Sequence, residues 1–390
     1  MLSTLKKVNF LITKRQRKGL VVLTLLLFIG MILEVFGLGI LIPTISIISD
    51  PKMIESNSIM SSIRSFFHEF SDNEFIFIFL GNVVIIYFIK SFFLVFLVFK
   101  QNRFINNISA NISYELLKNY MNQPYNFHLK QNTSELLKNV QVEVHHFHAY
   151  LLSLITLIIE GGFVLSILAT LIYVEPIGAI SIGVFFGILS LIFLRLTQKK
   201  IAEWGNLRQE VDTKVFKIAL EALGGIKELI IFGKKSFFIN DFKNNIFFKS
   251  RLSSNHATVT QIPRFYLELI SIIGLISFII LFLLKGQDFA TIVSILGLFV
   301  AATFRMMPSL NRMIAAKQSL KFNGFSLNII HRELKLKAKY DDKFSHESKF
   351  NFQNIIEFKK VNFKFNKSNT ILKSVDLKII KGESIGIIGE

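Results

Sequence analysis

The end of the sequence is the first place where residue type and spacing suggest chemistry. Residues 384–388, Ser-Ile-Gly-Ile-Ile, form a mostly apolar run that suits a buried strand, and Gly389 and Glu390 follow it. A glycine directly after a buried strand lets the backbone turn its N–H groups around an anion, because no Cβ is in the way. Gly389 could therefore open the phosphate-binding pattern G-x-x-x-x-G-K-[ST], whose later positions lie outside these 390 residues. Taken alone, such a glycine is more often an ordinary β-turn, so the preceding elements must decide.

Ionisable residues within or beside long apolar runs are the second candidate site. On insertion scales a charged residue costs about 2.5–3.5 kcal/mol at the centre of a membrane helix, so each needs a reason. Those inside the runs are Glu34, Lys90, Glu160, Glu268 and Arg305, and those at inner ends are Arg264 and Arg312.

Two interpretations of these charges compete. In the structural one, Lys90 or Arg305 pairs with a carboxylate or extends to the inner membrane interface, and the charges only fix the packing of the helices. The candidate carboxylates are Glu160 and Glu268. In the functional one, Arg264, Arg305 and Arg312 form a cationic inner vestibule for a phosphate or diphosphate group, which the guanidinium fork suits well.

The elements that must position these residues are transmembrane helices. The chain is 51% hydrophobic, with 42 phenylalanines and a mean hydropathy of +0.49, which is not the composition of a soluble globule. Apolar runs of about 18 residues or more can cross a hydrocarbon core of about 30 Å. Six candidates lie at 20–45, 75–99, 150–173, 178–196, 266–284 and 289–306.

The net charge of +18 follows the predicted membrane topology. Residues 1–19 carry six Lys or Arg and no acidic residue, whereas the short links 49–73, 174–177 and 285–288 together carry three basic and six acidic residues. This alternation is typical of cytoplasmic and external segments and places both ends of the chain in the cytoplasm. We therefore expect no nucleic-acid partner. Because cysteine is absent, disulfides and thiolate metal sites are excluded.

The segments outside the runs complete the domain organisation. Residues 1–19 have the amphipathic pattern of a helix lying in the membrane interface, and 20–331 form the six-helix domain. The long inner links keep helical periodicity, so the spans should continue into the cytoplasm as helices. Breaks at 122–127 and 232–238 predict a small amphipathic turn in each link, near 124–133 and 234–241.

The composition changes after the last span. Residues 332–350 are charged without apolar periodicity and indicate a linker. Residues 355–365 and 371–379 alternate like half-buried strands. Residues 351–390 are therefore expected to begin a second, β-rich domain.

This organisation resembles an ABC exporter half-transporter over the whole chain. The specific matches are residues 221–229 with Phe232-Gly233, the spaced residues Val361, Phe363 and Phe365, the pair Ile371-Leu372, and Gly382-Glu383. The resemblance implies an all-α membrane protein with six helices of the type 1 transmembrane fold and long cytoplasmic extensions. A truncated P-loop nucleotide-binding domain follows. It also implies ATP and Mg²⁺ as cofactors of the full-length protein, with Phe365 stacked on adenine and Gly389 and Glu390 opening the phosphate loop.

Among exporters, the chain looks most like bacterial lipid-linked oligosaccharide flippases. The stretches that suggest so are 32–36, 262–268 and 305–312. This similarity implies a polyprenyl-diphosphate glycolipid moved from the inner to the outer leaflet of the bacterial inner membrane. It implies membrane lipids and a second copy of the chain, or a paralogous half-transporter, as partners. The residues expected to bind substrate are Arg264, Glu268, Arg305, Arg312, Glu34 and Lys90.

Three alternatives stay open. The same scaffold could export drugs, lipids or peptides. The chain could also be a membrane transporter that does not use ATP, or an inactive fragment. Because residues 1–390 lack the later nucleotide-binding motifs, we expect no ATPase activity from this segment alone.

Overall fold

A computed structural model describes residues 2–49, 71–174, 176–284, 289–336, 354–364 and 370–388. The chain forms two compact units, Met1–Ala338 and Lys339–Glu390. The first is helical and the second contains two strands. Phe365, Gly389 and Glu390 lie outside the described residues, so their expected contacts with nucleotide stay predictions.

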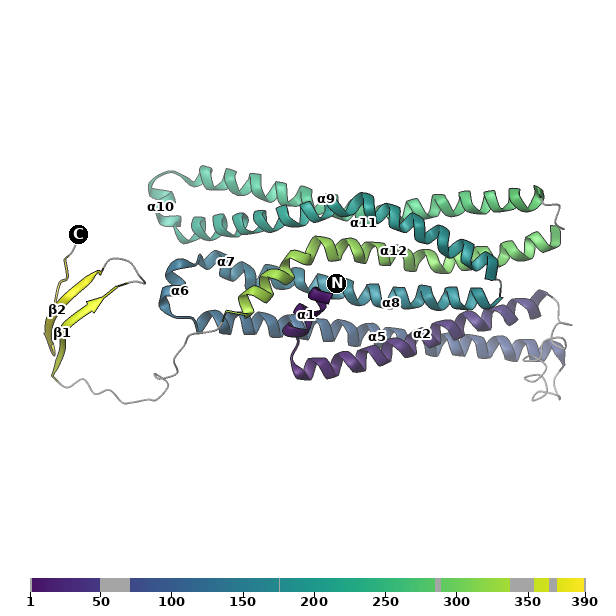
Figure 1. Ribbon diagram of the computed structural model, residues 1–390, viewed down its shortest axis with the longest axis horizontal. Helices are drawn as coiled ribbons and strands as arrows, with labels where there is room; N and C mark the ends of the chain where they lie inside the picture. The colour runs from purple at the N-terminus through teal and green to yellow at the C-terminus, as the bar shows by residue number, and fades with distance from the viewer. Residues whose placement is uncertain are drawn as a thin grey trace. The chain divides into compact units, whose positions relative to one another are not determined.

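Long helices dominate the first unit (Figure 1). They are α2 (Lys14–Ser49), α5 (Asp72–Met121), α8 (Val144–Val174), α9 (Pro176–Gly224), α11 (Lys235–Leu284) and α12 (Phe289–Leu334). Short elements complete it: α1 (Leu2–Leu11), α6 (Tyr125–Lys130), α7 (Thr133–Lys138), the π-helical turn η1 (Asn139–Glu143) and α10 (Ile226–Ile231).

The length of these helices bears on the expected cytoplasmic extensions. Both α5 and α11 contain 50 residues, and 50 residues of α-helix reach about 75 Å at about 1.5 Å per residue. This is more than twice the roughly 30 Å of a hydrocarbon core. The helices therefore project well beyond any membrane that they cross, as the periodicity of the inner links predicted. The last helix also continues to Leu334, so 332–334 are helical rather than part of the expected linker.

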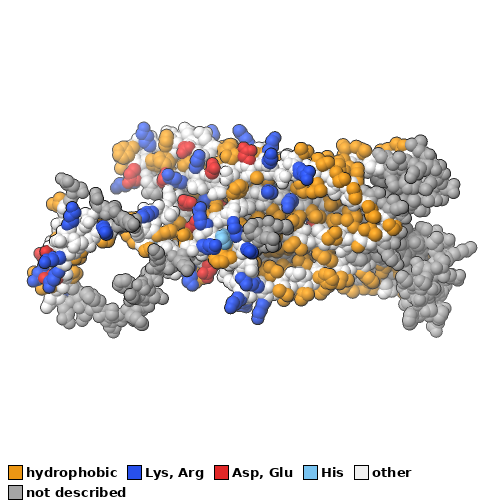
Figure 2. All heavy atoms as spheres, viewed as in Figure 1, with side chains coloured by type: hydrophobic (Ala, Val, Ile, Leu, Met, Phe, Trp, Pro, Cys, Tyr) orange, Lys and Arg blue, Asp and Glu red, His pale blue; other side chains and the backbone are white. Residues whose placement is uncertain are grey.

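Within the described residues, three stretches are long and apolar enough to cross a membrane: Lys14–Glu34, Glu74–Met121 and Thr133–Ala169. The other expected spans fall in α9, α11 and α12, where some side chains lie outside the described part. The total of six spans thus stays a prediction. In Figure 2, hydrophobic side chains cover the part of the helical unit farther from α6 and α10, and most Lys and Arg lie towards these two short helices.

The helical core is centred on α8 and α12, which run side by side. Ile108 and Phe147 are buried with Ile330 in a cluster that joins α5, α8 and α12. Helix α1 adds Val8 and Leu11 of its apolar face to the same cluster, and Ile12 follows directly after the helix. The expected interfacial helix is therefore covered by protein on its apolar side, because α5, α8 and α12 offer it an apolar surface.

Short helices lie where the long helices turn back, at one end of the helical unit (Figure 1). Helix α6 occupies the position predicted for the first turn. The predicted break at 232–238 contains the second reversal, at 232–234. The short helix expected near 234–241 lies before this reversal instead, as α10, and 235–241 form the first turns of α11. Gly233 has φ +65°, a conformation that glycine adopts without a Cβ clash, so the chain reverses there and α11 begins two residues later.

The second unit is a two-stranded antiparallel sheet. Strand β1 (Ile355–Phe363) pairs with β2 (Leu372–Ile380), with Ile355 opposite Ile380 and irregular pairing beyond Phe358. These strands match the two predicted ones. The predicted buried strand at 384–388 is wrong, because the segment pairs with neither β1 nor β2 and Ile388 is 99% exposed.

Close packing of α9 against α12 yields a test of the fold. A Cβ at Gly205 would lie 2.5 Å from the carbonyl oxygen of Phe322, whereas a Cβ at Gly187 of the same helix would meet nothing within 4 Å. We expect Gly205→Ala to destabilise the protein by about 1–3 kcal/mol through overpacking. Gly187→Ala should be neutral or stabilising, because alanine favours helix by about 1 kcal/mol over glycine. Denaturant unfolding in mixed micelles compares the two, and equal effects would contradict the α9–α12 contact.

Candidate functional site

Two of the candidate residues form a buried ion pair between α2 and α5. The Nζ of Lys90 lies 2.9 Å from Oε2 of Glu34, and both side chains are less than 10% exposed. Gly37 makes room for this pair, since a Cβ there would lie 2.8 Å from the same Nζ. The Tyr87 hydroxyl donates a hydrogen bond of 2.8 Å to the Gly37 carbonyl. Our expected partners for Lys90, Glu160 and Glu268, were therefore wrong, because Glu34 lies directly across the α2–α5 contact.

A second ion pair joins α8 to α12. The guanidinium of Arg312 donates through Nε and Nη2 to the two carboxylate oxygens of Glu160, with an Nη2–Oε2 distance of 3.1 Å. This two-point geometry is the strong form of an arginine–carboxylate contact. Glu160 is 9% exposed, whereas Arg312 is 53% exposed. The pair therefore fixes the guanidinium while leaving much of the Arg312 side chain accessible.

The remaining candidates are not brought into one described cluster. Arg264 and Glu268 lie one turn apart on α11, and both are exposed. Helix α11 packs on α12, where Arg305 belongs to the helix but its side chain lies outside the described part. Each of the two interpretations therefore describes part of the set. Glu34 pairs with Lys90 and Glu160 with Arg312, while Arg264 and much of the Arg312 side chain remain accessible. The vestibule itself stays a prediction.

A buried charged cluster that the sequence analysis missed lies in the helical extensions beyond the predicted spans. Its centre is Asp212 of α9, which is 1% exposed. Arg208 lies 3.2 Å from Oδ2 of Asp212 on the same helix. Lys249 of α11 lies 2.6 Å from Oδ1, and Nε2 of His146 of α8 lies 3.5 Å from Oδ2. One carboxylate thus connects three helices.

A second buried pair adjoins this cluster at the π-helical turn. The Nζ of Lys138 lies 3.2 Å from Oε1 of Glu143, and these side chains are 2% and 0% exposed. The Ser326 hydroxyl of α12 donates to Glu143, and Lys138 also donates to Thr213, next to Asp212 on α9, at 3.1 Å. The junction between α7 and α8 is therefore tied to both α9 and α12.

The protonation of the cluster follows from these contacts. Burial alone would raise the pKa of Asp212, but hydrogen bonds from His146 and Lys249 and the charge of Arg208 hold this pKa below its usual value. The carboxylate is therefore charged at neutral pH.

His256 of α11 stacks on Phe322 of α12 at the edge of the same cluster, with ring centroids 4.0 Å apart. Burial, together with the charges of Arg208 and His146, lowers the pKa of His256 to about 4. The imidazole is therefore neutral at neutral pH.

A sequence signal for part of this cluster was present. Arg208 and Asp212 occupy the same three- and four-residue spacing as the buried residues Ile201 and Val215. Charged residues on an apolar helical stripe indicate buried pairing. Among the described residues, no group of three or more His, Cys, Asp or Glu is arranged to hold a metal. The chemistry of the cluster is therefore charge pairing between helices.

Removing one member of the π-turn pair tests its burial. Lys138→Met should cost about 3–5 kcal/mol of unfolding free energy, because Glu143 is left as an uncompensated buried charge. Adding Glu143→Gln should recover part of this loss. Lys217→Met is the control, because Lys217 forms an exposed pair with Glu221 at 3.7 Å, and exposed pairs contribute about 0–1 kcal/mol. Denaturant unfolding in mixed micelles measures all three, and a single mutant no worse than the control would contradict the pair.

Acid sensitivity tests the environment of His256. The unfolded chain binds a proton at His256 near pH 6.5, whereas the folded state resists protonation down to about pH 4. The stability contributed by neutral His256 is complete above about pH 6.5 and is lost as the pH falls towards 4. His256→Phe keeps an aromatic ring against Phe322 and should reduce the loss of thermal stability across this range. A variant as acid-sensitive as the parent would show that another group is responsible.

A comparison of the sequence with known protein families identifies the family of this helical unit. Residues 20–306 match the family described as ABC transporter transmembrane region. This segment covers most of the stretches long and apolar enough to cross a membrane, both short turns and the Glu34–Lys90 pair. Of the second ion pair it contains Glu160, whereas Arg312 lies just beyond its end. The long apolar helices and their extensions agree with a membrane protein that transports a substrate. The chain belongs to the ABC transporter transmembrane region family.

Proposed function

We propose that this chain supplies the membrane half of an ATP-driven exporter that flips an amphipathic lipid-linked substrate from the inner to the outer leaflet. The proposed substrate is a lipid-linked oligosaccharide or another polyprenyl-diphosphate glycolipid. The proposed location is the bacterial inner membrane, with both chain ends in the cytoplasm. The observation that carries the proposal is the accessible side chain of Arg312, which the buried carboxylate of Glu160 holds just beyond the predicted sixth span, in the middle of α12.

The chemistry of a diphosphate suits this arrangement. A diphosphate offers several anionic oxygens, and arginine binds such groups through two parallel hydrogen bonds. Glu160 occupies one edge of the Arg312 guanidinium, which orients the accessible remainder. Arg264 on the adjacent helix α11 is also exposed. These two cations, with Arg305, would bind the head group while its lipid chain remains in the bilayer.

The short turns support coupling to a nucleotide-binding domain. Tyr125 of α6 is 74% exposed, and Ile231 and Phe232 at the end of α10 are 67% and 72% exposed. Exposed apolar side chains clustered at one end of a helical unit typically mark a contact with another protein surface. We assign this contact to nucleotide-binding domains. Their closure around ATP and Mg²⁺ would move the long helices between two packed states.

A second subunit completes the proposed pathway. Half-transporters of this organisation provide one half of the helices around a substrate path, so a homodimer, or a pair with a paralogous chain, is required. In the full-length protein, Phe365 would stack on adenine and Gly389 and Glu390 would open the phosphate loop. The roles of Glu34 and Lys90 in this scheme are to hold α2 on α5, since each neutralises the other.

Charge reversal at Arg305 tests the substrate class. In the full-length protein, the ratio of ATPase rates with and without a polyprenyl-diphosphate lipid should fall to about one in Arg305→Glu, because a carboxylate repels the head group. Arg103→Glu, an exposed change on α5, is the matched control and should retain stimulation.

Transport of labelled diphosphate lipid in vesicles separates the possible failures. Loss of both stimulation and transport in Arg305→Glu supports the proposal. Unchanged stimulation in this variant would refute the vestibule. Failure of the parent protein to move the lipid, while it moves another amphipathic compound, would refute the substrate class and leave the exporter intact.

A further inference from the structure

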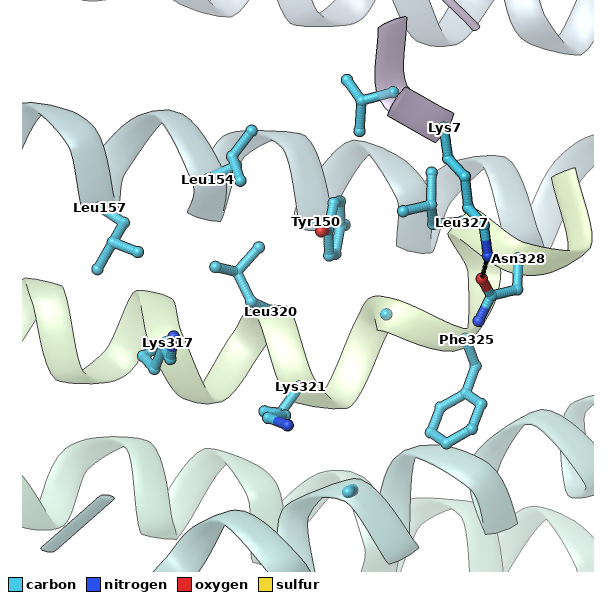
Figure 3. A pocket seen from close by; sticks show the side chains of 13 residues that line it. Lys7, Tyr150, Leu154, Leu157, Lys317, Leu320, Lys321, Phe325, Leu327 and Asn328 are labelled. Carbon is cyan, nitrogen blue, oxygen red and sulfur yellow. Dashed lines mark hydrogen bonds between the residues drawn. The ribbon is translucent and has the colours of Figure 1, made fainter. Parts of the chain in front are cut away.

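A groove outside the predicted substrate site lies over α12 between α1, α8 and α9. It has a volume of about 440 Å³, which is within the range of about 300–1,000 Å³ for small-molecule sites. Figure 3 shows its lining side chains, with residues of α8 on one side of α12 and Lys317 and Lys321 on the other. None of the candidate ionisable residues discussed above lines this groove. It is therefore a separate feature of the molecule.

The charge of the groove is entirely positive. Three lysines line it, Lys7, Lys317 and Lys321, and no Asp or Glu does. Lys7 donates a hydrogen bond of 2.6 Å to Oδ1 of Asn328 (Figure 3), which orients its ammonium group over α12. Lys317 and Lys321 are exposed and lie one turn apart. Like charges at this spacing destabilise a helix by a few tenths of a kcal/mol, and an anion placed between them would remove this repulsion.

The opposite wall of the groove is apolar. Leu154 and Leu157 of α8 and Leu320 of α12 line it, with the ring of Tyr150 beside them. Gly324 also lines it, and a Cβ there would approach only Tyr150, at 4.0 Å. The lining therefore combines a cationic edge with a hydrocarbon surface.

The groove lies on the inner side of the predicted spans, beside the predicted interfacial helix. Tyr150 begins a predicted span and Leu157 lies about two turns inside it, whereas Lys317 and Lys321 lie on the part of α12 that continues beyond the last predicted span. Lys7 precedes the first predicted span. Basic side chains next to apolar ones at this depth face the anionic head groups of the inner leaflet, where each Lys or Arg contributes about 1 kcal/mol of attraction.

We propose that this groove binds an anionic phospholipid of the inner leaflet. The phosphate lies between Lys317 and Lys321, and an acyl chain runs along Leu154 and Leu157 towards the bilayer. Lys7 lies on the α1 side of the groove and adds to its positive charge. This site is occupied whatever substrate the protein transports, so it does not depend on the proposed diphosphate lipid.

Lipid binding to the delipidated full-length protein tests the proposal. The probe is phosphatidylglycerol, measured by native mass spectrometry, with phosphatidylcholine of the same chains as the zwitterionic comparison. Replacing two lysines in Lys317→Gln/Lys321→Gln should weaken phosphatidylglycerol binding about 30-fold, the equivalent of about 1 kcal/mol for each charge. Lys214→Gln/Lys243→Gln removes two exposed lysines of α9 and α11 outside the groove and should bind like the parent. Equal affinity of the two double variants would overturn the proposal.

Two further measurements distinguish a bound lipid from other possible occupants of the groove. Inorganic phosphate at concentrations equal to the lipid should not displace phosphatidylglycerol, and displacement would show a free-anion site instead. A change from dimer to monomer in the Lys317/Lys321 variant, with lipid affinity unaltered, would identify the groove as a contact between subunits and overturn the proposal.

A fluorescence measurement tests the apolar wall independently. Leu157→Trp should be quenched by phosphatidylglycerol with brominated chains and much less by brominated phosphatidylcholine. The native Trp204, the one tryptophan of the sequence, gives the background signal in the parent protein. Equal quenching by the two lipids would show that Leu157 contacts bulk membrane and not a selected lipid.

Discussion

The pairing of buried charges is the constraint on which the rest of the helical unit depends. A buried charge is costly unless an opposite charge and hydrogen bonds compensate it. The described helices carry such charges at three places along their length: Glu34 with Lys90, Glu160 with Arg312, and the cluster around Asp212. Each pair joins different helices or, at Asp212, gathers several around one carboxylate. Hydrophobic packing brings the helices together, and the paired charges restrict how they can slide against one another.

The predictable part of the fold follows from local patterns. The long helices could be predicted because periodicity continues through the inner links, and β1 and β2 because their residues alternate. The position of the second short helix could not be predicted. The break at 232–238 contains Gly233, but the short helix forms before this glycine rather than after it. Residues 384–388 have the composition of a buried strand, yet burial requires a neighbouring strand and a covering layer. In the described residues that segment has neither.

The candidate site shows a similar division. The sequence identifies which ionisable residues lie in apolar runs, because a charge in such a run needs no tertiary information to be noticed. It does not identify their partners, since helices distant along the chain must first be placed side by side. Lys90 therefore pairs with Glu34 rather than with either expected glutamate. For the Asp212 cluster, the spacing of Arg208 and Asp212 along α9 is visible in the sequence, but their partners Lys249 and His146 belong to other helices. Only the packing of α8, α9 and α11 therefore reveals the cluster.

The π-helical turn η1 constrains the number of residues between α7 and α8. Lys138 and Glu143 are five residues apart, a spacing that an α-helix would place about 140° apart at about 100° per residue. The i to i+5 geometry of a π-turn brings them onto one side. Deleting or inserting a single residue here would therefore turn every buried side chain of one helix away from its neighbours. This short segment should tolerate exchanges of residue type far better than changes in residue number.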